Sequence, residues 1–184
     1  FRLAGYRQWG RLMQDDVTDG VRHLVADGTS DPARICIVGA SYGGYSALAG
    51  AAFTPELYAC AASINGVADL PAMVLAAERE MGEDSNAASY WVEHIGPPAD
   101  PNVIGRSPAR SAQTVRAPVL LLHGAEDAVV PYSQSESMDR ALRKFGKPVT
   151  LVPLPGEDHW LSRSETRMQV LQELEKFLAA NLKK

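Results

Sequence analysis

The stretch ICIVGASYGGYSALAGAAF, residues 35–53, constrains the fold of this chain more than any other part of the sequence. An apolar run typical of a buried strand ends at Gly39, the polar residue Ser41 follows, and a run of small residues typical of a helix begins beyond it. Residues 39–43 match G-x-S-x-G, the nucleophile elbow, in which a sharp strand-to-helix turn exposes a serine hydroxyl. The stretch therefore predicts a strand, a tight turn and a helix whose N-terminal N–H groups face a developing oxyanion.

The elbow interpretation depends on its context, because a five-residue motif alone also matches incidental glycine turns. A tight elbow brings the residues two before and two after the serine together, so we expect both to lack bulky side chains, as Gly39 and Gly43 do. The match lies where a strand pattern meets a helix pattern. That position favours a catalytic serine at Ser41 over a structural turn.

A serine hydroxyl is a poor nucleophile until a base takes its proton, so an elbow predicts an acid and a histidine in the chain order Ser, Asp or Glu, His. The strand-like run PVLLLHG, residues 118–124, is followed by Asp127. The next such run, PVTLVPL, residues 148–154, is followed by His159. Ser41, Asp127 and His159 are therefore the predicted catalytic residues.

Other acids and histidines are weaker candidates for the same roles. Glu126 neighbours the predicted acid, and Asp158 neighbours the predicted base, where a sequence neighbour rarely orients an imidazole. His23 falls on the polar face of a helix pattern and His94 in an irregular segment. His123 ends a strand pattern, and we interpret it as packing under the acid loop.

The alternation of strand and helix patterns predicts an α/β fold with a parallel sheet. Strands are expected near residues 35–40, 58–65, 118–124 and 148–154, and amphipathic helices near 9–25, 133–146 and 162–178. Ser133 with Glu136, and Ser162 with Glu165, have capping-box spacing at the starts of the last two helices. We interpret residues 1–184 as one partial domain, with residues 66–117 as a proline-containing excursion between the second and third strands.

Composition limits the partners that the chain can have. The chain has 184 residues, a formal net charge of −4, and no apolar run long enough to span a membrane, so we expect neither nucleic acid nor membrane as a partner. No signal-peptide pattern follows Phe1, and a cytoplasmic location is the working expectation. No CxxC or HExxH motif is present, so no metal is expected. Cys36 and Cys60 are predicted to be free core thiols on adjacent strands, where disulfide geometry is seldom met.

Three segments together resemble the catalytic domain of the prolyl oligopeptidase family of serine peptidases: GASYGGYSAL (39–48), SPARSAQTVRAPVLLLHGAEDAVVP (107–131) and LPGEDHWLSRSETR (154–167). With EREMG (78–82), they are most similar to its dipeptidyl peptidase and acylaminoacyl peptidase branch. The resemblance implies an α/β-hydrolase fold and a peptidase that cleaves short peptides without a cofactor. It implies catalytic roles for Ser41, Asp127 and His159, an oxyanion-binding backbone N–H on Tyr42, and a substrate pocket lined by Tyr42, Val67 and Val130.

The sequence also departs from that family. It matches only the C-terminal half of the hydrolase sheet, about four strands, without the β-propeller, so the strand near 35–40 is expected at an open edge. We therefore expect weakened hydrolysis and self-association through that edge, that is, a homo-oligomer. Trp160 replaces the usual glycine and is expected to narrow the leaving-group side, and NGVADLPAMV (65–74) lacks the aromatic residues of a proline-selective pocket.

Two other functions remain open at the level of sequence. A carboxylesterase or thioesterase uses the same serine, acid and histidine on easier leaving groups. A non-catalytic fragment is the alternative from a different class, because the family's second oxyanion donor lies outside the matched segments. Reaction of Ser41 with a fluorophosphonate distinguishes an enzyme from a non-catalytic fragment. Side-by-side assays of anilides and esters distinguish a peptidase from an esterase.

Overall fold

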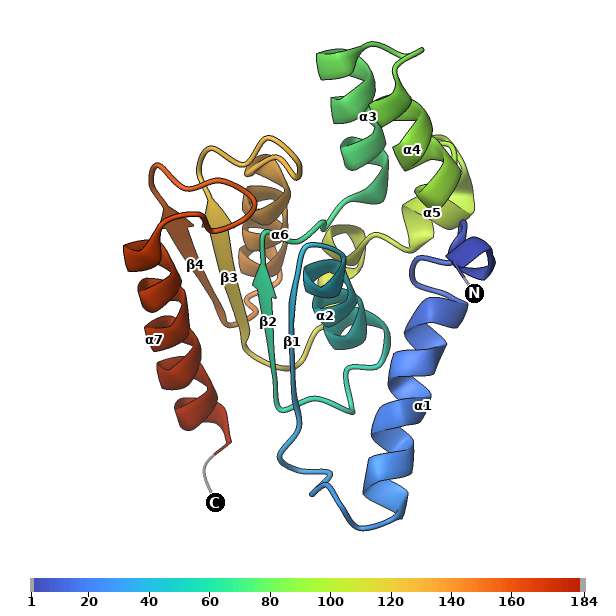
Figure 1. The fold of residues 1–184 in the computed structure, drawn as a ribbon. Coiled ribbons are helices and arrows are strands. Elements are labelled where there is room, and N and C mark those ends of the chain that lie inside the picture. The colour runs from blue at the N-terminus through green and yellow to red at the C-terminus, as the bar shows by residue number, and fades with distance from the viewer. Residues whose placement is uncertain (1, 183–184) are drawn as a thin grey trace.

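The computed structural model describes residues 2–182, whose elements alternate as the sequence patterns predict (Figure 1). Leu12–Ala26 (α1) precedes the sheet strands Cys36–Ala40 (β1), Cys60–Ile64 (β2), Val119–Gly124 (β3) and Val149–Leu154 (β4). The other helices are Tyr42–Phe53 (α2), Leu70–Met81 (α3), Asn86–Ile95 (α4), Pro101–Gly105 (α5), Ser133–Lys144 (α6) and Ser164–Asn181 (α7). Two 3₁₀ helices, Arg2–Gly5 (η1) and Pro108–Thr114 (η2), complete the described chain.

The four strands form one parallel sheet in the order β1-β2-β3-β4, which confirms the expected α/β architecture. Parallel neighbours need crossover connections, and α2, the 66–117 segment and α6 supply them in turn. Because all four strands are parallel, their carboxyl ends meet at one side of the sheet. β1 and β4 lie at the edges in the described residues, and Val38 of β1 is 42% exposed.

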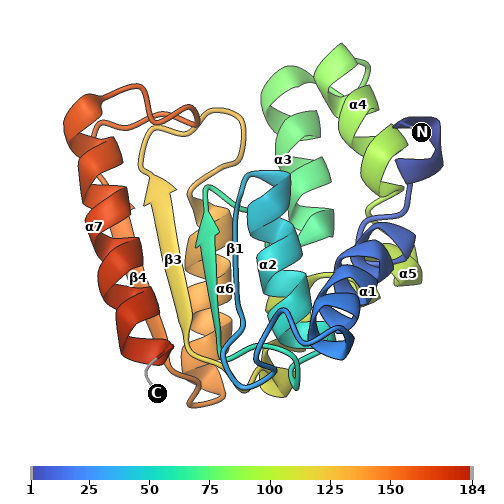
Figure 2. The same ribbon diagram turned by 60° about the horizontal axis from the view of Figure 1, so that its bottom comes forward.

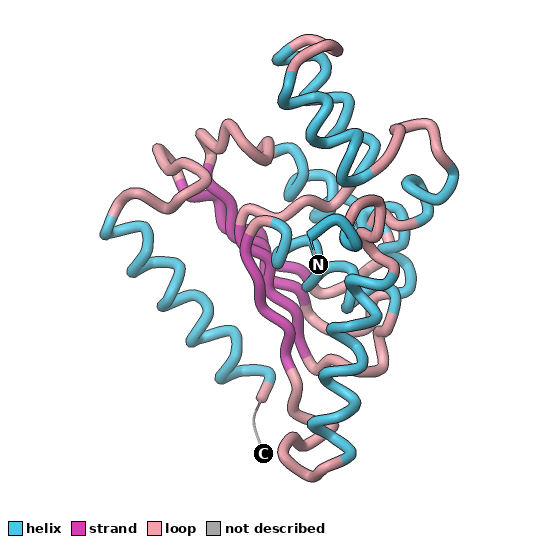
Figure 3. The backbone as a smooth tube through the Cα atoms, turned by 45° about the vertical axis from the view of Figure 1, so that its right-hand side comes forward, coloured by secondary structure: helices cyan, strands magenta, loops and turns pink. Residues whose placement is uncertain are grey.

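Helices cover both faces of the sheet, as the view along its edge shows (Figure 3). α7 lies on one face, while α2 and α6 lie on the other. Side chains alternate between the two faces along each strand, because successive residues of a strand point in opposite directions. Those toward α2 and α6 include Ala61, Val119 and Leu121, and those toward α7 include Ala62, Leu120 and Leu122.

A third apolar cluster joins the sheet layer to the helices of the excursion. Its buried members include Trp9, Tyr45, Leu70 and Ile95, which come from the segment before α1 and from α2, α3 and α4. α3 and α4 form a pair of adjacent helices that projects beyond the carboxyl ends of the strands (Figures 1 and 2). The excursion between β2 and β3 thus rises over the side of the sheet where the predicted catalytic residues lie.

Both predicted capping boxes are wrong, although both helices exist. Ser133 is the first residue of α6, whose N-cap is Tyr132, and no side chain caps that helix. α7 begins two residues later than expected, because the Ser162 hydroxyl donates to Asp158 Oδ2 (2.7 Å) rather than capping the helix. Neither serine therefore acts as the N-cap of its helix, although the spacing with the following glutamate is right.

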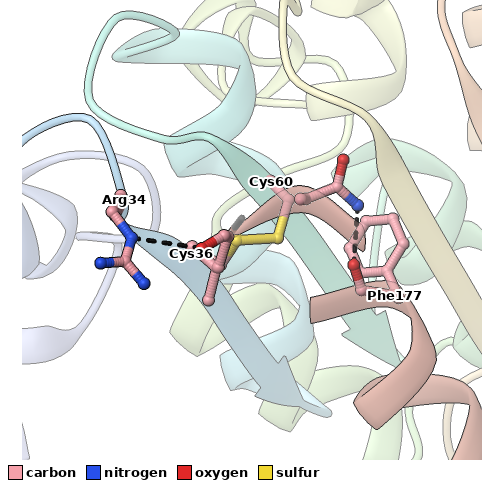
Figure 4. The surroundings of a disulfide bond; sticks show 6 residues. Arg34, Cys36, Cys60 and Phe177 are labelled. Carbon is pink, nitrogen blue, oxygen red and sulfur yellow. Dashed lines mark hydrogen bonds between the residues drawn. A yellow bond between two sulfur atoms is a disulfide. The ribbon is translucent and has the colours of Figure 1, made fainter. Parts of the chain in front are cut away.

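Cys36 and Cys60 form a disulfide, so the prediction of free thiols is wrong (Figure 4). The two residues do lie on adjacent parallel strands, as expected, and they are direct register partners at the starts of β1 and β2. Their Cα atoms are 4.6 Å apart, inside the range that a disulfide spans. Strand adjacency therefore does not exclude the bond here, because the register places the two side chains opposite each other.

We expect titration of the denatured, unreduced protein to find no thiol, because neither cysteine is free in the described chain. Reduction should lower the free energy of unfolding by about 3 kcal/mol, since the bond closes a loop whose ends are 24 residues apart. Denaturant curves with and without reductant measure this loss, and the double variant Cys36→Ser, Cys60→Ser should match the reduced protein. Two thiols titrating without reductant would contradict the pairing.

Candidate active site

Ser41 occupies the sharp turn between β1 and α2. Its backbone has φ 56° and ψ −119°, in a region that side-chain-bearing residues rarely adopt. Its N–H donates to the Ile64 carbonyl (2.9 Å), which ties the turn to the end of β2. A Cβ atom on Gly39 would collide with the backbone carbonyl of Gly43, so the residue two before the serine must be glycine. The turn is therefore strained and tightly fixed.

The second elbow glycine has a different role from the one expected. A Cβ atom on Gly43 would meet no atom within 4 Å, so close packing does not require glycine there. A Cβ atom on the next residue, Gly44, would lie 2.7 Å from Ser63 Oγ and 2.8 Å from the Cα of Gly66. Residues 39 and 43 do approach each other as the motif predicts, but the second position that excludes a side chain is Gly44, which packs against the backbone that follows β2.

The three predicted catalytic side chains meet at the carboxyl ends of the strands. His159 Nε2 lies 3.0 Å from Ser41 Oγ, and His159 Nδ1 lies 2.7 Å from Asp127 Oδ2. A carboxylate only accepts hydrogen bonds, so Nδ1 carries the proton and Nε2 is left as the acceptor for the serine hydroxyl. The side chains of His159 and Asp127 are 6% and 0% exposed, so water barely competes for these bonds.

The environment of Asp127 keeps its carboxylate ionised. Its Oδ1 accepts from the Val129 and Val130 N–H groups, each at 2.8 Å. Burial opposes ionisation, but hydrogen bonds from His123, His159 and these two amides outweigh it and hold the pKa of Asp127 below its ordinary value. The turn after β3 therefore presents a fixed negative charge to His159.

His123 lies beneath the acid loop, where packing was expected for it. Its Nε2 donates to the Val130 carbonyl (2.8 Å), and its Nδ1 accepts from the Ser135 hydroxyl (2.7 Å). The same Nε2 is 3.4 Å from Asp127 Oδ2. This fully buried ring connects β3, the acid loop and the start of α6, and so it supports the position of Asp127.

The rival candidates lie elsewhere. Asp158 accepts from the Trp160 N–H (2.9 Å) and from Ser162, and no hydrogen bond joins it to the His159 ring in the described chain. Glu126 is exposed. His23 is exposed near Asp27, and His94 Nδ1 bonds the Tyr90 carbonyl (2.8 Å) on α4. Among the acids considered, Asp127 is the one that reaches the imidazole.

Asn65 is a residue of the site that sequence reasoning missed. It directly follows β2, is 2% exposed, and has a φ of 48°. Its Nδ2 donates to the His159 carbonyl (3.0 Å), and its Oδ1 accepts from the Gly124 N–H (2.8 Å). Asn65 therefore links the ends of β2 and β3 to the histidine loop. A polar residue just after a strand, of a type that tolerates positive φ, was the available signal.

An open cleft of about 580 Å³ surrounds Ser41 and His159. Its lining also includes Asn65, Tyr90, Trp91, Val129, Trp160 and Leu161. A second, apolar hollow of about 200 Å³ shares Ala87, Trp91 and Val129 with the cleft. It continues between α3, α4 and the acid loop, where its lining includes Met73, Ala77, Met81 and a single acid, Glu80. The two hollows therefore adjoin each other, and Ser41 lies in the larger one.

The residues expected to line the substrate pocket lie mainly in the core. Val67 and Val130 are both 0% exposed and belong to the apolar cluster beside α2. The Tyr42 ring packs edge-to-face on Trp9 with ring centroids 4.6 Å apart, and burial, with the charge of Asp16 second, raises the pKa of Tyr42 to about 12. None of the three is among the residues lining the two hollows. Tyr42 is nonetheless the first residue of α2, where a helix leaves its backbone N–H groups free of helical partners.

The described residues, 2–182, contain neither a metal-binding cluster nor a membrane-spanning helix. No group of three or more histidine, cysteine, aspartate or glutamate side chains is arranged to hold a metal ion in this range. No helix in the same range has the length and apolar character needed to cross a membrane.

The family model of the prolyl oligopeptidase family, Peptidase_S9, matches residues 1–184. The chain belongs to the prolyl oligopeptidase family. Dipeptidyl aminopeptidase BIII of Pseudoxanthomonas mexicana is 31% identical over 97% of the chain and 26% of that protein. A puromycin-hydrolyzing peptidase of Mycobacterium tuberculosis is 33% identical, with a TM-score of 0.89 over 98% of this chain and 27% of that one. An acylaminoacyl peptidase of Pyrococcus horikoshii is 28% identical, with a TM-score of 0.85 over 100% and 30% of the two chains.

These matches confirm the resemblance and the α/β-hydrolase fold expected from the sequence. The chain spans between a quarter and a third of the length of the relatives named above.

Proposed function

We propose that this chain carries the catalytic machinery of a serine peptidase that works through an acyl-enzyme. The observation that supports this most strongly is the pair of hydrogen bonds from His159, at 3.0 Å to Ser41 and 2.7 Å to Asp127. In the first half-reaction Ser41 Oγ attacks the scissile carbonyl while His159 Nε2 takes its proton. His159 then gives that proton to the departing amine, and the acyl group stays on Ser41 as an ester.

In the second half-reaction a water molecule takes the place of the amine. His159 accepts a proton from the water, which attacks the ester carbonyl, and the proton returns to Ser41 Oγ as the acid product leaves. Asp127 holds the Nδ1 proton in place and stabilises the imidazolium formed in each half. The Tyr42 N–H, at the start of α2, is the proposed oxyanion donor, and one such donor is worth roughly 10²–10³ in rate.

The lining of the hollow beside the cleft supports an apolar residue before the cut. The hollow that adjoins the cleft is lined by Met73, Ala77, Met81 and Trp91, which suit an aliphatic side chain. Two of the relatives are named as a dipeptidyl aminopeptidase and an acylaminoacyl peptidase, in agreement with a peptidase function. Trp91 is the single aromatic residue that lines this hollow. The hollow therefore has too little aromatic surface to favour proline specifically.

The proposal is tested by assaying leucyl p-nitroanilide beside the p-nitrophenyl ester of the same acyl group. We expect both to be hydrolysed and both activities to be lost after reaction with a fluorophosphonate. Hydrolysis of the ester alone would instead indicate the carboxylesterase or thioesterase alternative, because the amine of an anilide is a poorer leaving group than the phenolate of an ester. Absence of both activities, with no reaction at Ser41, would indicate the non-catalytic alternative.

A further inference from the structure

A tryptophan stands exposed at the edge of the cleft. Trp160 directly follows His159 and is 75% exposed, the highest value among the large apolar side chains of the described residues. It lines the same cleft as Ser41 and His159. An exposed indole inside a binding cleft offers a large, rigid apolar surface that a bound molecule can cover.

The loop that carries this indole is firmly held. The Asp158 carboxylate accepts from the Trp160 N–H (2.9 Å), the Ser162 N–H (3.2 Å) and the Ser162 hydroxyl (2.7 Å). Leu161, between them, has a φ of 52°, in the left-handed region that a side-chain-bearing residue rarely adopts. The indole lies nearly perpendicular to the His159 imidazole, at 88°, with ring centroids 5.2 Å apart. Trp160 is thus positioned relative to the proposed base.

The mechanism of acylation determines which part of the substrate lies beside Trp160. His159 Nε2 gives its proton to the departing amine, so the leaving group must lie beside the imidazole. The apolar hollow adjoins the cleft at Ala87, Trp91 and Val129 and is lined by α3 and α4, and neither His159 nor Trp160 is among its lining residues. It can therefore take the acyl part of the substrate, while Trp160 lies beside the residue that follows the cut.

We propose that Trp160 is a specificity-determining residue for the leaving group, and that its indole stacks on an aromatic side chain immediately after the scissile bond. The inference rests on the serine-peptidase function proposed above and adds the preferred leaving group to it. Stacked aromatic pairs contribute about 0.5–1.5 kcal/mol beyond their area, which corresponds to a preference of up to about tenfold. A glycine in the same place has no side chain to stack.

Acyl transfer to added amines measures how well the leaving-group site binds each amine. The acyl group is the same in every reaction, so differences between amines do not depend on the acyl pocket. An acyl-enzyme formed from an N-blocked leucine p-nitrophenyl ester is offered either phenylalaninamide or glycinamide in competition with water. The amine nitrogen attacks the ester carbonyl, His159 takes one proton from that nitrogen and returns it to Ser41 Oγ, and a new amide bond replaces the ester. The product ratio of peptide to free acid reports how well each amine occupies the leaving-group site.

The expected result is a selectivity for phenylalaninamide over glycinamide that falls about tenfold in Trp160→Ala. Trp160→Phe, which keeps an aromatic ring, should retain most of the selectivity. Phe145→Ala is the matched control, because it removes another exposed aromatic ring, which lies just after α6 and lines neither hollow. Trp160→Leu provides a second truncation that keeps apolar bulk, in case the alanine variant is poorly folded.

The outcomes separate this inference from the function on which it rests. If wild type hydrolyses the ester and Trp160→Ala and Trp160→Leu keep the wild-type selectivity, the leaving-group role is overturned and the peptidase proposal stands. If wild type forms no acyl-enzyme at all, both fail together. If selectivity falls equally in Phe145→Ala, the effect is not a property of the cleft, and the inference is overturned.

Discussion

Replacing Ser41 by alanine should lower the hydrolysis of leucyl p-nitroanilide by at least about 10⁴-fold, because the attacking oxygen is lost. Stability should change by less than about 1 kcal/mol, since the side chain lies in the open cleft and its removal leaves no cavity in the core. Initial rates and thermal midpoints of the two proteins measure both effects. Ser164→Ala is the matched control, because it removes an exposed serine hydroxyl at the start of α7. Turnover near the wild-type level in Ser41→Ala would rule out the serine as nucleophile.

Asp127→Asn should lower turnover about 10⁴-fold while leaving the backbone of the site in place. The Val129 and Val130 N–H groups donate to Oδ1 at 2.8 Å, so in the variant the amide oxygen must occupy that position. The amide nitrogen then faces His159 Nδ1 and donates to it. This forces the proton of the neutral imidazole onto Nε2, which can no longer accept from Ser41.

The control for this variant is Glu126→Gln, the same carboxyl-to-amide change at the neighbouring, exposed position. Surface substitutions of this kind usually have small effects, so turnover should stay within about twofold of wild type. A large loss in Glu126→Gln together with near-normal Asp127→Asn would move the acid to Glu126. Equal losses in both variants would indicate damage to the whole loop.

Asp127→Asn should also change how the free energy of unfolding depends on pH. The pKa of Asp127 is lower in the folded protein than the ordinary value of about 3.9, so its ionised form stabilises the fold above that pH. That stabilisation is lost as the pH falls toward the folded pKa. The free energy of unfolding, obtained from denaturation curves between about pH 5 and pH 3, should therefore fall less steeply with decreasing pH for Asp127→Asn than for wild type.

The parts of the fold that sequence predicted are those set by local patterns. The four strands, the order of Ser41, Asp127 and His159 and the helix of small residues all follow from apolar periodicity and from residues at strand ends. Because the strands are parallel and in chain order, residues that follow them come together at one side of the sheet. Local pattern and topology were therefore sufficient to bring the three side chains into one place.

The features that sequence reasoning missed depend on register and on contacts between distant segments. The Cys36–Cys60 disulfide follows from the pairing register of β1 and β2, which the apolar runs do not specify. Asn65 acts on a carbonyl 94 residues away. The requirement for glycine at Gly44 comes from Ser63 and Gly66 on the far side of the helix, not from the motif itself. Such contacts exist only once the sheet is assembled.

The most direct test of the proposed nucleophile is the reaction of the protein with diisopropyl fluorophosphate, followed by intact mass measurement and peptide mapping. An activated serine loses its proton to His159 as it displaces fluoride, so one adduct is expected on Ser41 in wild type. His159→Ala should react far more slowly, because the base is lost, although Ser41 is still present. No adduct in wild type, an adduct at another residue, or an equal rate in His159→Ala would contradict the assignment of Ser41 as a nucleophile activated by His159.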